Sequence, residues 1–176
     1  LSNLVLYKNN LYVLNDNGKI YSFDSKTGSQ NWSYESATNI LKNYSAFQVA
    51  ADLDKLIFSN DLGDIYCIDL VQKNLAWSLN VEVNTNLAIS NNLLQLSKII
   101  IKDNDVFIST NKNKIINVNL NTGQINWSQD LPYSSTVTSL VVPNNIINLT
   151  NNGYVSILDK ANGSILYRKN ILINFE

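Results

Sequence analysis

One short pattern occurs four times in the chain, and this repetition constrains the fold more than any other feature. The clearest copy runs from Ile20 to Trp32. The other three align with it without a gap: Ile65 to Trp77, Ile115 to Trp127 and Val155 to Tyr167. A turn residue lies 14 positions before each final aromatic: Gly18, Gly63, Asn113 and Gly153. The repeated unit is therefore a turn, a strand, a second turn and a second strand.

The four aromatics recur at intervals of 45, 50 and 40 residues, so length varies only between one aromatic and the next turn. Variation of this kind belongs to loops. Residues 37–47, 83–95 and 131–136 are the variable stretches. We expect function, where it lies in this segment, to reside there.

Two further strands precede each repeated unit, which gives a four-stranded antiparallel meander. In the first repeat we expect strands at 2–7, 11–15, 20–24 and 30–36, with Asn17-Gly18 in a tight hairpin turn. The corresponding strands of the later repeats are 44–51, 55–59, 65–69 and 75–81; 96–102, 105–110, 115–119 and 124–130; and 136–142, 146–150, 154–159 and 164–170.

Several predicted strands are apolar at consecutive positions, for example Leu56-Ile57-Phe58 and Val106-Phe107-Ile108. A half-exposed strand alternates with period two, so these strands are predicted to be covered on both faces. Repeated four-stranded meanders of ~40 to 50 residues, each covered by its neighbours, are the blades of a β-propeller. The predicted fold is all-β, a partial β-propeller over 1–176 with about four blades, approximately 1–36, 44–82, 94–130 and 134–171.

The turn inside each copy opens with an Asp or Asn whose side-chain oxygen can accept backbone N–H groups: Asp24, Asp69, Asn119 and Asp159. Three of these turns end with a glycine suited to the left-handed conformation: Gly28, Gly123 and Gly163. Lys73 occupies that position in the second copy. We expect the left-handed conformation to shift there to Asn74, which tolerates it better.

The final aromatics Trp32, Trp77, Trp127 and Tyr167 share one register. An identical register favours packing between blades over a ligand-stacking platform. Replacing one of them with alanine is expected to cost ~3 to 5 kcal/mol.

Composition excludes much enzyme chemistry. The chain has no histidine and a single cysteine, Cys67, which we expect to be a small buried strand residue. His-based metal sites, Ser-His-Asp triads and Cys-His dyads are therefore excluded from this segment. A net charge of -1 without a basic run gives no footprint for a phosphate backbone, so no nucleic-acid partner is predicted.

Six carboxylates are candidate Ca²⁺ ligands: Asp52, Asp54, Asp61, Asp64, Asp103 and Asp105. They lie at predicted turns and match no twelve-residue calcium loop, so we expect them to cap turns. No metal site is predicted. No apolar run approaches the ~18 residues of a spanning helix. Because the first residue is Leu1, we expect a processed chain or a piece of a longer one.

The pattern Asp-x-x-Thr-Gly-x-x-x-Trp, present as Asp24 to Trp32 and, with Asn first, as Asn119 to Trp127, resembles the tryptophan-docking repeat of PQQ-like β-propellers. The resemblance covers essentially the whole chain and implies that each Trp packs on the neighbouring blade. The second repeat lacks Thr-Gly, and the fourth has Tyr167 in place of Trp. Such propellers usually close with seven or eight blades, so we expect about half a ring. Apolar end surfaces are then expected near Leu4-Val5-Leu6 and Ile165-Leu166-Tyr167.

Within this family the chain most resembles the BamB-type outer-membrane assembly lipoprotein. That resemblance implies a non-catalytic scaffold, without a cofactor, which binds the outer-membrane barrel-assembly protein. The expected location is the periplasm, at the outer membrane, with any lipid anchor outside this segment.

Two alternatives remain open. A fragment of a PQQ-dependent quinoprotein dehydrogenase would imply PQQ, Ca²⁺, a catalytic Asp and commonly a cysteine pair, whereas Cys67 is alone. An extracellular glycan-binding or sensor propeller would require clustered exposed aromatics, for which Tyr34, Tyr44 and Tyr133 are the candidates.

Overall fold

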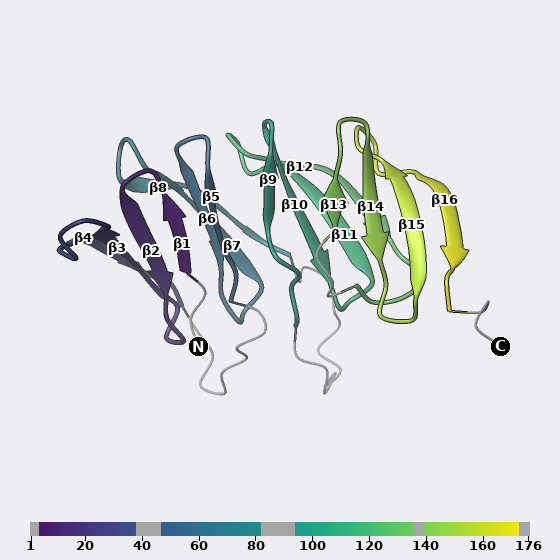
Figure 1. Cartoon of the computed structure of the whole chain (residues 1–176), viewed down its shortest axis with the longest axis horizontal. Coiled ribbons are helices and arrows are strands. Elements are labelled where there is room, and N and C mark those ends of the chain that lie inside the picture. Colours follow the sequence, from purple (N-terminus) through teal and green to yellow (C-terminus); the bar gives the residue numbers. More distant parts are fainter. Residues whose placement is uncertain (1–3, 38–46, 82–93, 136–138, 173–176) are drawn as a thin grey trace. The chain divides into compact units, whose positions relative to one another are not determined.

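The structure, a computed structural model, describes residues 4–37, 47–81, 94–135 and 139–172. These residues form strands and turns without any helix. Accordingly, this part of the chain has no helix long and apolar enough to cross a membrane. The chain divides into two compact units, Leu1–Leu94 and Gln95–Glu176, and each unit holds two four-stranded sheets (Figure 1).

The first unit contains two antiparallel sheets with their strands in chain order. Blade one is built from β1 (Leu4–Tyr7), β2 (Asn10–Leu14), β3 (Lys19–Asp24) and β4 (Gln30–Glu35). Blade two is built from β5 (Val49–Asp52), β6 (Lys55–Ser59), β7 (Asp64–Asp69) and β8 (Asn74–Asn80).

The second unit repeats this arrangement. Blade three is built from β9 (Ile100–Lys102), β10 (Asp105–Thr110), β11 (Lys114–Asn119) and β12 (Ile125–Asp130). Blade four is built from β13 (Leu140–Val141), β14 (Asn145–Leu149), β15 (Tyr154–Asp159) and β16 (Ile165–Asn170).

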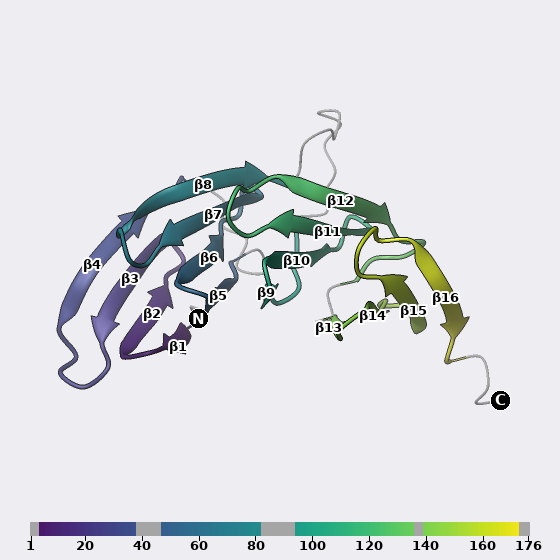
Figure 2. The same cartoon turned by 90° about the horizontal axis from the view of Figure 1, so that it is seen from above.

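Blades one and two pack face to face. The contact is made by every second side chain along each strand, on the side that points toward the other blade. Tyr12, Leu14 and Ile20 of blade one form one buried cluster with Leu56 and Phe58 of blade two. β1 lies beside β5 in this stack, as Figure 2 shows. Full burial of each such side chain is worth about 1.5–3 kcal/mol, so this cluster holds the first unit together.

Blades three and four stack in the same way. Phe107 and Ile115 of blade three form a buried cluster with Ile146 and Leu158 of blade four and with Leu131 of the connecting loop. The repeat therefore places the same strand positions in the core of both units.

Burial differs among the second strands of the four blades. β6 and β10 are buried at every position after the first, as expected of strands covered on both faces. β2 and β14 alternate between buried and half-buried positions. One face of blade one and one face of blade four thus stay partly accessible.

The first strands of blades three and four are shorter than the sequence predicted. Leu96 makes only an isolated bridge to Thr110, and β9 begins at Ile100. The hydroxyl of Ser97 accepts the N–H of Ser109 at 3.2 Å, so a side chain takes a donor that a regular ladder would give to the backbone. Of the predicted elements, residues 2–3, 44–46, 83–93 and 136–138 lie outside the described residues.

The prediction for the second hairpin loop is wrong. Lys73 itself has a positive φ of 57°, and Asn74 is already in β8, paired with Asp69. The N–H of Lys73 donates to the Asp69 carbonyl at 2.8 Å, as the N–H of Gly28 does to the Asp24 carbonyl at 2.9 Å. The loop keeps its length and its hydrogen bond, so the fifth residue must be left-handed whatever its side chain.

Lys73→Gly is expected to stabilise the protein by about 0.5–1 kcal/mol. Glycine removes the left-handed strain of ~1–2 kcal/mol, partly offset by its greater freedom in the unfolded chain. Urea denaturation measures the change. Gln72→Gly, one residue earlier and without a positive φ, should be neutral or destabilising. Equal effects of the two substitutions would contradict this account.

Candidate functional site at the blade junctions

The hairpin loop between the third and fourth strands of each blade is built on one side-chain oxygen. The first residue, Asp24, Asp69, Asn119 or Asp159, accepts the N–H groups two and three positions later through Oδ1, over 2.7–3.2 Å. The N–H of Thr27 is the main cause that lowers the pKa of Asp24. The pKa of Asp69 is also lowered, mainly by the hydrogen bond from the N–H of Gln72 and next by the hydrogen bond from the side chain of Lys55.

Asp24→Asn should make the protein less sensitive to acid. The folded pKa of Asp24 lies below its ordinary value of 3.8, so the carboxylate stabilises the fold above about pH 4. That contribution disappears as the pH falls through the folded pKa. An amide accepts the same N–H groups without titrating, as Asn119 does. Urea midpoints at pH 6 and pH 3 should differ less than in the unmodified chain, and Asn119→Asp should show a larger difference.

A β-bulge directly precedes the final aromatic of the repeat, in the fourth strand of every blade. The register between the third and fourth strands shifts between Ser22 and Phe23, and at the equivalent places in the other three sheets. The extra residues are Asn31, Ala76, Asn126 and Leu166, each directly before the final aromatic. A bulge bends the strand and redirects the next side chain, so it sets the direction of the aromatic ring.

Trp127 makes the most completely described contact between two blades. Its Nε1–H donates to the carbonyl of Lys160 at 3.0 Å, and its ring lies 6.2 Å from that of Phe107. A Cβ placed on Gly163 would lie 2.4 Å from the ring, so only glycine leaves room for it. Gly163 also has a φ of +75°. Trp127 of blade three thus packs on the hairpin loop of blade four.

The other three aromatics occupy the equivalent strand position. Trp32 packs against the core of the first unit, 5.9 Å from the Tyr12 ring, and Trp77 is 8% exposed. Tyr167 is 51% exposed. The blade-docking role of these three stays a prediction, as does that of the loop residues Gly28, Gly123, Asp24, Asp69, Asn119 and Asp159.

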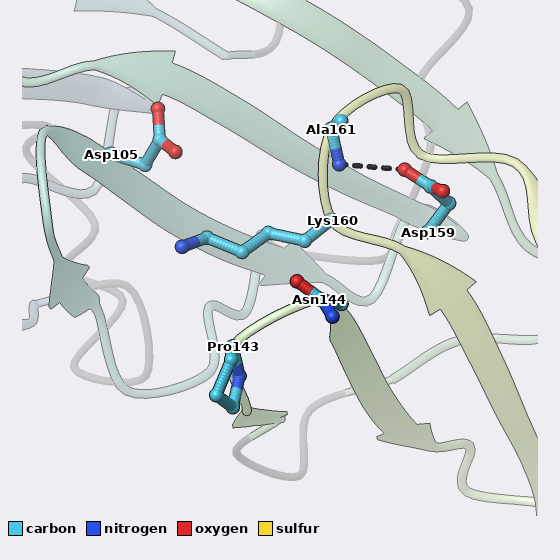
Figure 3. A pocket seen from close by; sticks show the side chains of 6 residues that line it. All are labelled: Asp105, Pro143, Asn144, Asp159, Lys160 and Ala161. Carbon is cyan, nitrogen blue, oxygen red and sulfur yellow. Dashed lines mark hydrogen bonds between the residues drawn. The ribbon is translucent and has the colours of Figure 1, made fainter.

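A pocket of about 400 Å³ lies next to the Trp127 contact. Its lining residues come from β10 and from two turns of blade four: Asp105, Pro143, Asn144, Asp159, Lys160 and Ala161. Figure 3 shows Lys160 extended across the pocket between Asp105 and Pro143. The ammonium group pairs with Asp103 at 2.6 Å, and this bond is the main cause that lowers the pKa of Asp103. The lining holds no hydroxyl, thiol or imidazole, and it suits polar contacts better than nucleophilic chemistry.

The turn carboxylates act differently from what the sequence predicted. Asp52 bonds a backbone N–H, at 2.8 Å, but Asp54 and Asp103 pair with Lys8 and Lys160. Asp64 and Asp105 accept hydrogen bonds from asparagine side chains. In the described ranges no three His, Cys, Asp or Glu side chains group together to hold a metal.

Asparagine side chains also cap turns, including the turn at Asp61 that a carboxylate was expected to cap. Oδ1 of Asn15 accepts the N–H groups of Asn17 and Lys19, and Oδ1 of Asn60 accepts those of Leu62 and Asp64. Both asparagines stand one residue before the aspartate of the turn. The signal was present in the sequence, because Asn is as good a turn residue as Asp.

A buried polar cluster in the second unit was not anticipated. Asn148 is fully buried and donates to the hydroxyls of Ser135 and Ser139 at 2.9 Å. Ser109 lies 3.1 Å from Ser139. The signal is a lone amide in the apolar run Ile146-Ile147-Asn148-Leu149, which requires buried partners.

The aromatic candidates for a glycan platform are not gathered on a surface. Tyr34 is half-buried against Phe58 and Tyr66 in the first core. Tyr133 is 37% exposed and stacks on Tyr154 at 4.9 Å, and Tyr44 lies outside the described residues. Cys67 is buried as expected, and burial raises its pKa to about 12, so the thiol stays protonated at neutral pH.

Four-stranded antiparallel sheets in a repeat of this kind define a partial β-propeller of about four blades. A family profile described as Outer membrane protein assembly factor BamB matches residues 1–169. The chain belongs to this family. The resemblance drawn from the Asp-to-Trp pattern is thereby confirmed.

Solved structures share the fold. BamB from Moraxella catarrhalis has a TM-score of 0.76 at 16% identity, over 94% of this chain and 50% of that one. The computationally designed Ika8 protein has a TM-score of 0.73 at 15% identity, over 95% and 48%. The quinohemoprotein alcohol dehydrogenase ADHIIG from Pseudomonas putida HK5 has a TM-score of 0.72 at 12% identity, over 95% and 33%.

The chain spans half the length or less of these three solved structures. No curated protein sequence matches it. At such low identities the structural similarity establishes the all-β propeller fold alone, and function requires a separate argument.

Proposed function

We propose that the chain is a non-catalytic propeller scaffold that takes part in the assembly and insertion of outer-membrane β-barrel proteins. The match of the BamB family profile to residues 1–169 carries this proposal. In it, the chain works in the periplasm at the outer membrane and binds the barrel-assembly protein without a cofactor.

The chemistry of the described residues supports a scaffold. The thiol of Cys67 is buried and protonated, and the lysine of the pocket is held in an ion pair with Asp103. The recurring loop residues form turns, and Trp32 and Trp127 pack against the buried cores. Rigid sheets that present variable loops are a frequent arrangement for protein recognition.

The contact surface in this proposal is the set of variable loops 37–47, 83–95 and 131–136. Of these, the loop 131–136 is described except for residue 136, and it carries the half-exposed Tyr133 on Tyr154. A rigid, stacked tyrosine at a loop is the kind of side chain that anchors protein interfaces.

Biolayer interferometry with the immobilised chain and a purified barrel-assembly protein in detergent tests the proposal. We expect saturable binding that Tyr133→Ala weakens by about tenfold, or ~1.4 kcal/mol. Val71→Ala, in an exposed hairpin loop, is the matched control and should bind normally. Absence of binding by the unmodified chain would contradict the proposal.

The same preparation distinguishes the enzyme alternative, which the similarity to the quinohemoprotein dehydrogenase keeps in view. Titration with PQQ and Ca²⁺, followed by absorbance and by dye reduction with an alcohol, should give neither saturable binding nor turnover. Turnover would replace the scaffold by a quinoprotein enzyme.

A further inference from the structure

Asparagine followed by glycine occurs three times in the chain, at Asn17-Gly18, Asn152-Gly153 and Asn162-Gly163. Glycine has no side chain to shield its own backbone nitrogen, so this nitrogen can reach the side-chain carbonyl carbon of the preceding asparagine. Attack at that carbon closes a succinimide ring and expels ammonia. All three pairs lie in turns, and the asparagine of each is exposed. Each pair is therefore a chemical candidate for this reaction.

A hydrogen bond to its own side chain distinguishes Asn162. The N–H of Ser164 donates to Oδ1 of Asn162 at 2.8 Å. Such a donor stabilises the negative charge that a carbonyl oxygen gains when a nucleophile attacks its carbon. The ring that this hydrogen bond closes contains both the side-chain carbonyl carbon of Asn162 and the backbone nitrogen of Gly163. The two atoms that join in the reaction are thus held in one small ring.

The corresponding N–H groups of the other two pairs are directed elsewhere. Each donates to a side chain that precedes the asparagine: Lys19 to Oδ1 of Asn15 at 2.9 Å, and Tyr154 to Oγ1 of Thr150 at 3.1 Å. The N–H of the glycine donates to a backbone carbonyl in all three turns, over 2.9–3.2 Å, so this bond does not separate the sites. The hydrogen bond to the side-chain carbonyl does.

The Asn162-Gly163 pair also lies at the contact between blades three and four. A Cβ placed on Gly163 would lie 2.4 Å from the Trp127 ring, and the carbonyl of Lys160 accepts Nε1–H of Trp127 at 3.0 Å. The N–H of Gly163 donates to the Asp159 carbonyl at 2.9 Å, which fixes the end of the loop. A change in the backbone between residues 162 and 163 therefore acts directly on the Trp127 contact.

We propose that Asn162 is a modification site at which the chain converts itself to isoaspartate, and that this conversion releases Trp127 from the hairpin loop of blade four. The reaction occurs within one loop and requires only water, so it needs no partner. Isoaspartate places one extra methylene in the backbone before Gly163, which moves the glycine relative to the ring. This inference does not depend on the proposed function.

The reaction has two steps. In the first, the nitrogen of Gly163 bonds to the side-chain carbonyl carbon of Asn162, and the bond from that carbon to Nδ2 breaks. The proton of the Gly163 N–H leaves with Nδ2 as ammonia. In the second, water opens the ring, so that its hydroxyl adds to one carbonyl carbon and its hydrogen returns to the nitrogen. Opening at the main-chain carbonyl gives isoaspartate, and opening at the side-chain carbonyl gives aspartate.

Peptide mapping by mass spectrometry, with electron-transfer fragmentation to identify isoaspartate, measures the reaction at each pair in the 176-residue chain. During ageing of the folded chain in warm, mildly alkaline buffer, we expect Asn162 to react about tenfold faster than Asn17 and Asn152, the effect of one hydrogen bond to developing charge. In concentrated urea the three pairs should react at similar rates. Equal rates in the folded chain, or a faster reaction at either other pair, would overturn the assignment of the site.

Asn162→Thr is the matched control. Thr27 and Thr122 occupy this position in blades one and three, and the Oγ1 of each accepts the N–H two positions later at 3.3 Å. Threonine therefore suits the loop and has no amide to lose. Ageing should raise the unfolding equilibrium constant of the second unit at least about tenfold in the unmodified chain, through lost loop and Trp127 hydrogen bonds, and leave Asn162→Thr unchanged.

Asn162→Asp separates the two products of ring opening. It carries the aspartate side chain on a backbone of normal length, so the freshly prepared variant should unfold at nearly the same urea concentration as the fresh unmodified chain. An aged chain that contains isoaspartate at residue 162 and unfolds like the fresh chain would overturn the proposed release of Trp127. So would a fresh Asn162→Asp variant as unstable as the aged chain, because the added charge and not the longer backbone would then be the cause.

Discussion

Replacing Trp127 with alanine is expected to lower the free energy of unfolding of the second unit by about 3 kcal/mol. Truncation of a large core aromatic costs about 3–5 kcal/mol, and the lower end applies because this ring is only partly buried. The loss combines the contact with Phe107, the packing on Gly163 and the hydrogen bond to the Lys160 carbonyl.

Two controls separate these contributions. Trp127→Phe keeps an aromatic ring and removes the donor to the Lys160 carbonyl. It should therefore lower the free energy of unfolding by about 1 kcal/mol more than the smaller ring area alone would. Tyr167→Ala removes the aromatic from the equivalent position of blade four, where it is half exposed. This change should cost less than about 1 kcal/mol.

Thermal unfolding followed by tryptophan fluorescence and circular dichroism measures all three variants. Trp127→Ala should lower the midpoint of the second unit by about 12–24 °C, since ~1 kcal/mol corresponds to about 4–8 °C in a unit of this size. Equal effects of Trp127→Ala and Tyr167→Ala would show that the contact with the next blade contributes nothing.

The repetition of the sequence was sufficient to predict the sheets. The 14-residue spacing from turn to aromatic contains the third strand, the hairpin loop and the start of the fourth strand, so the third and fourth strands of every blade lie close to where they were predicted. The sequence also predicted that Asp24 and its equivalents accept backbone N–H groups of the hairpin loop. An Asp or Asn at the start of a tight loop commonly makes these hydrogen bonds.

The prediction for Lys73 was wrong because it considered only the preference of asparagine over lysine for the left-handed conformation. The loop in blade two keeps the hydrogen bond from residue 73 to the Asp69 carbonyl, and the register of β8 fixes Asn74 as a strand residue. A shift of the left-handed residue would have disturbed the whole strand pair. A strain of ~1–2 kcal/mol at one lysine is the smaller cost.

The partners of polar side chains were the least predictable part. The pairs Lys160 with Asp103 and Lys8 with Asp54 join turns separated by 57 and 46 residues. No local pattern contains such a pair, because it arises only when two blades stack. The four bulges were also missed, since Asn31, Ala76, Asn126 and Leu166 share no side-chain property.

Replacing Gly163 with alanine is expected to cost about 3 kcal/mol, whereas the same change at Gly28 should cost about 1 kcal/mol. The two glycines end equivalent hairpin loops in blades four and one, with nearly the same φ of +75° and +72°. The left-handed strain of ~1 kcal/mol that alanine would suffer is therefore common to both positions. They differ in what the new methyl group meets.

At Gly163 the methyl carbon would lie 2.4, 2.7 and 2.9 Å from three carbons of the Trp127 ring, and at Gly28 it would meet nothing within 4 Å. Overpacking of this kind costs about 1–3 kcal/mol, and the hydrogen bond of Trp127 to Lys160 hinders retreat of the ring. Urea denaturation measures both variants. A difference below about 0.5 kcal/mol would mean that the ring moves aside freely. The glycine would then serve the turn alone and not the junction between blades.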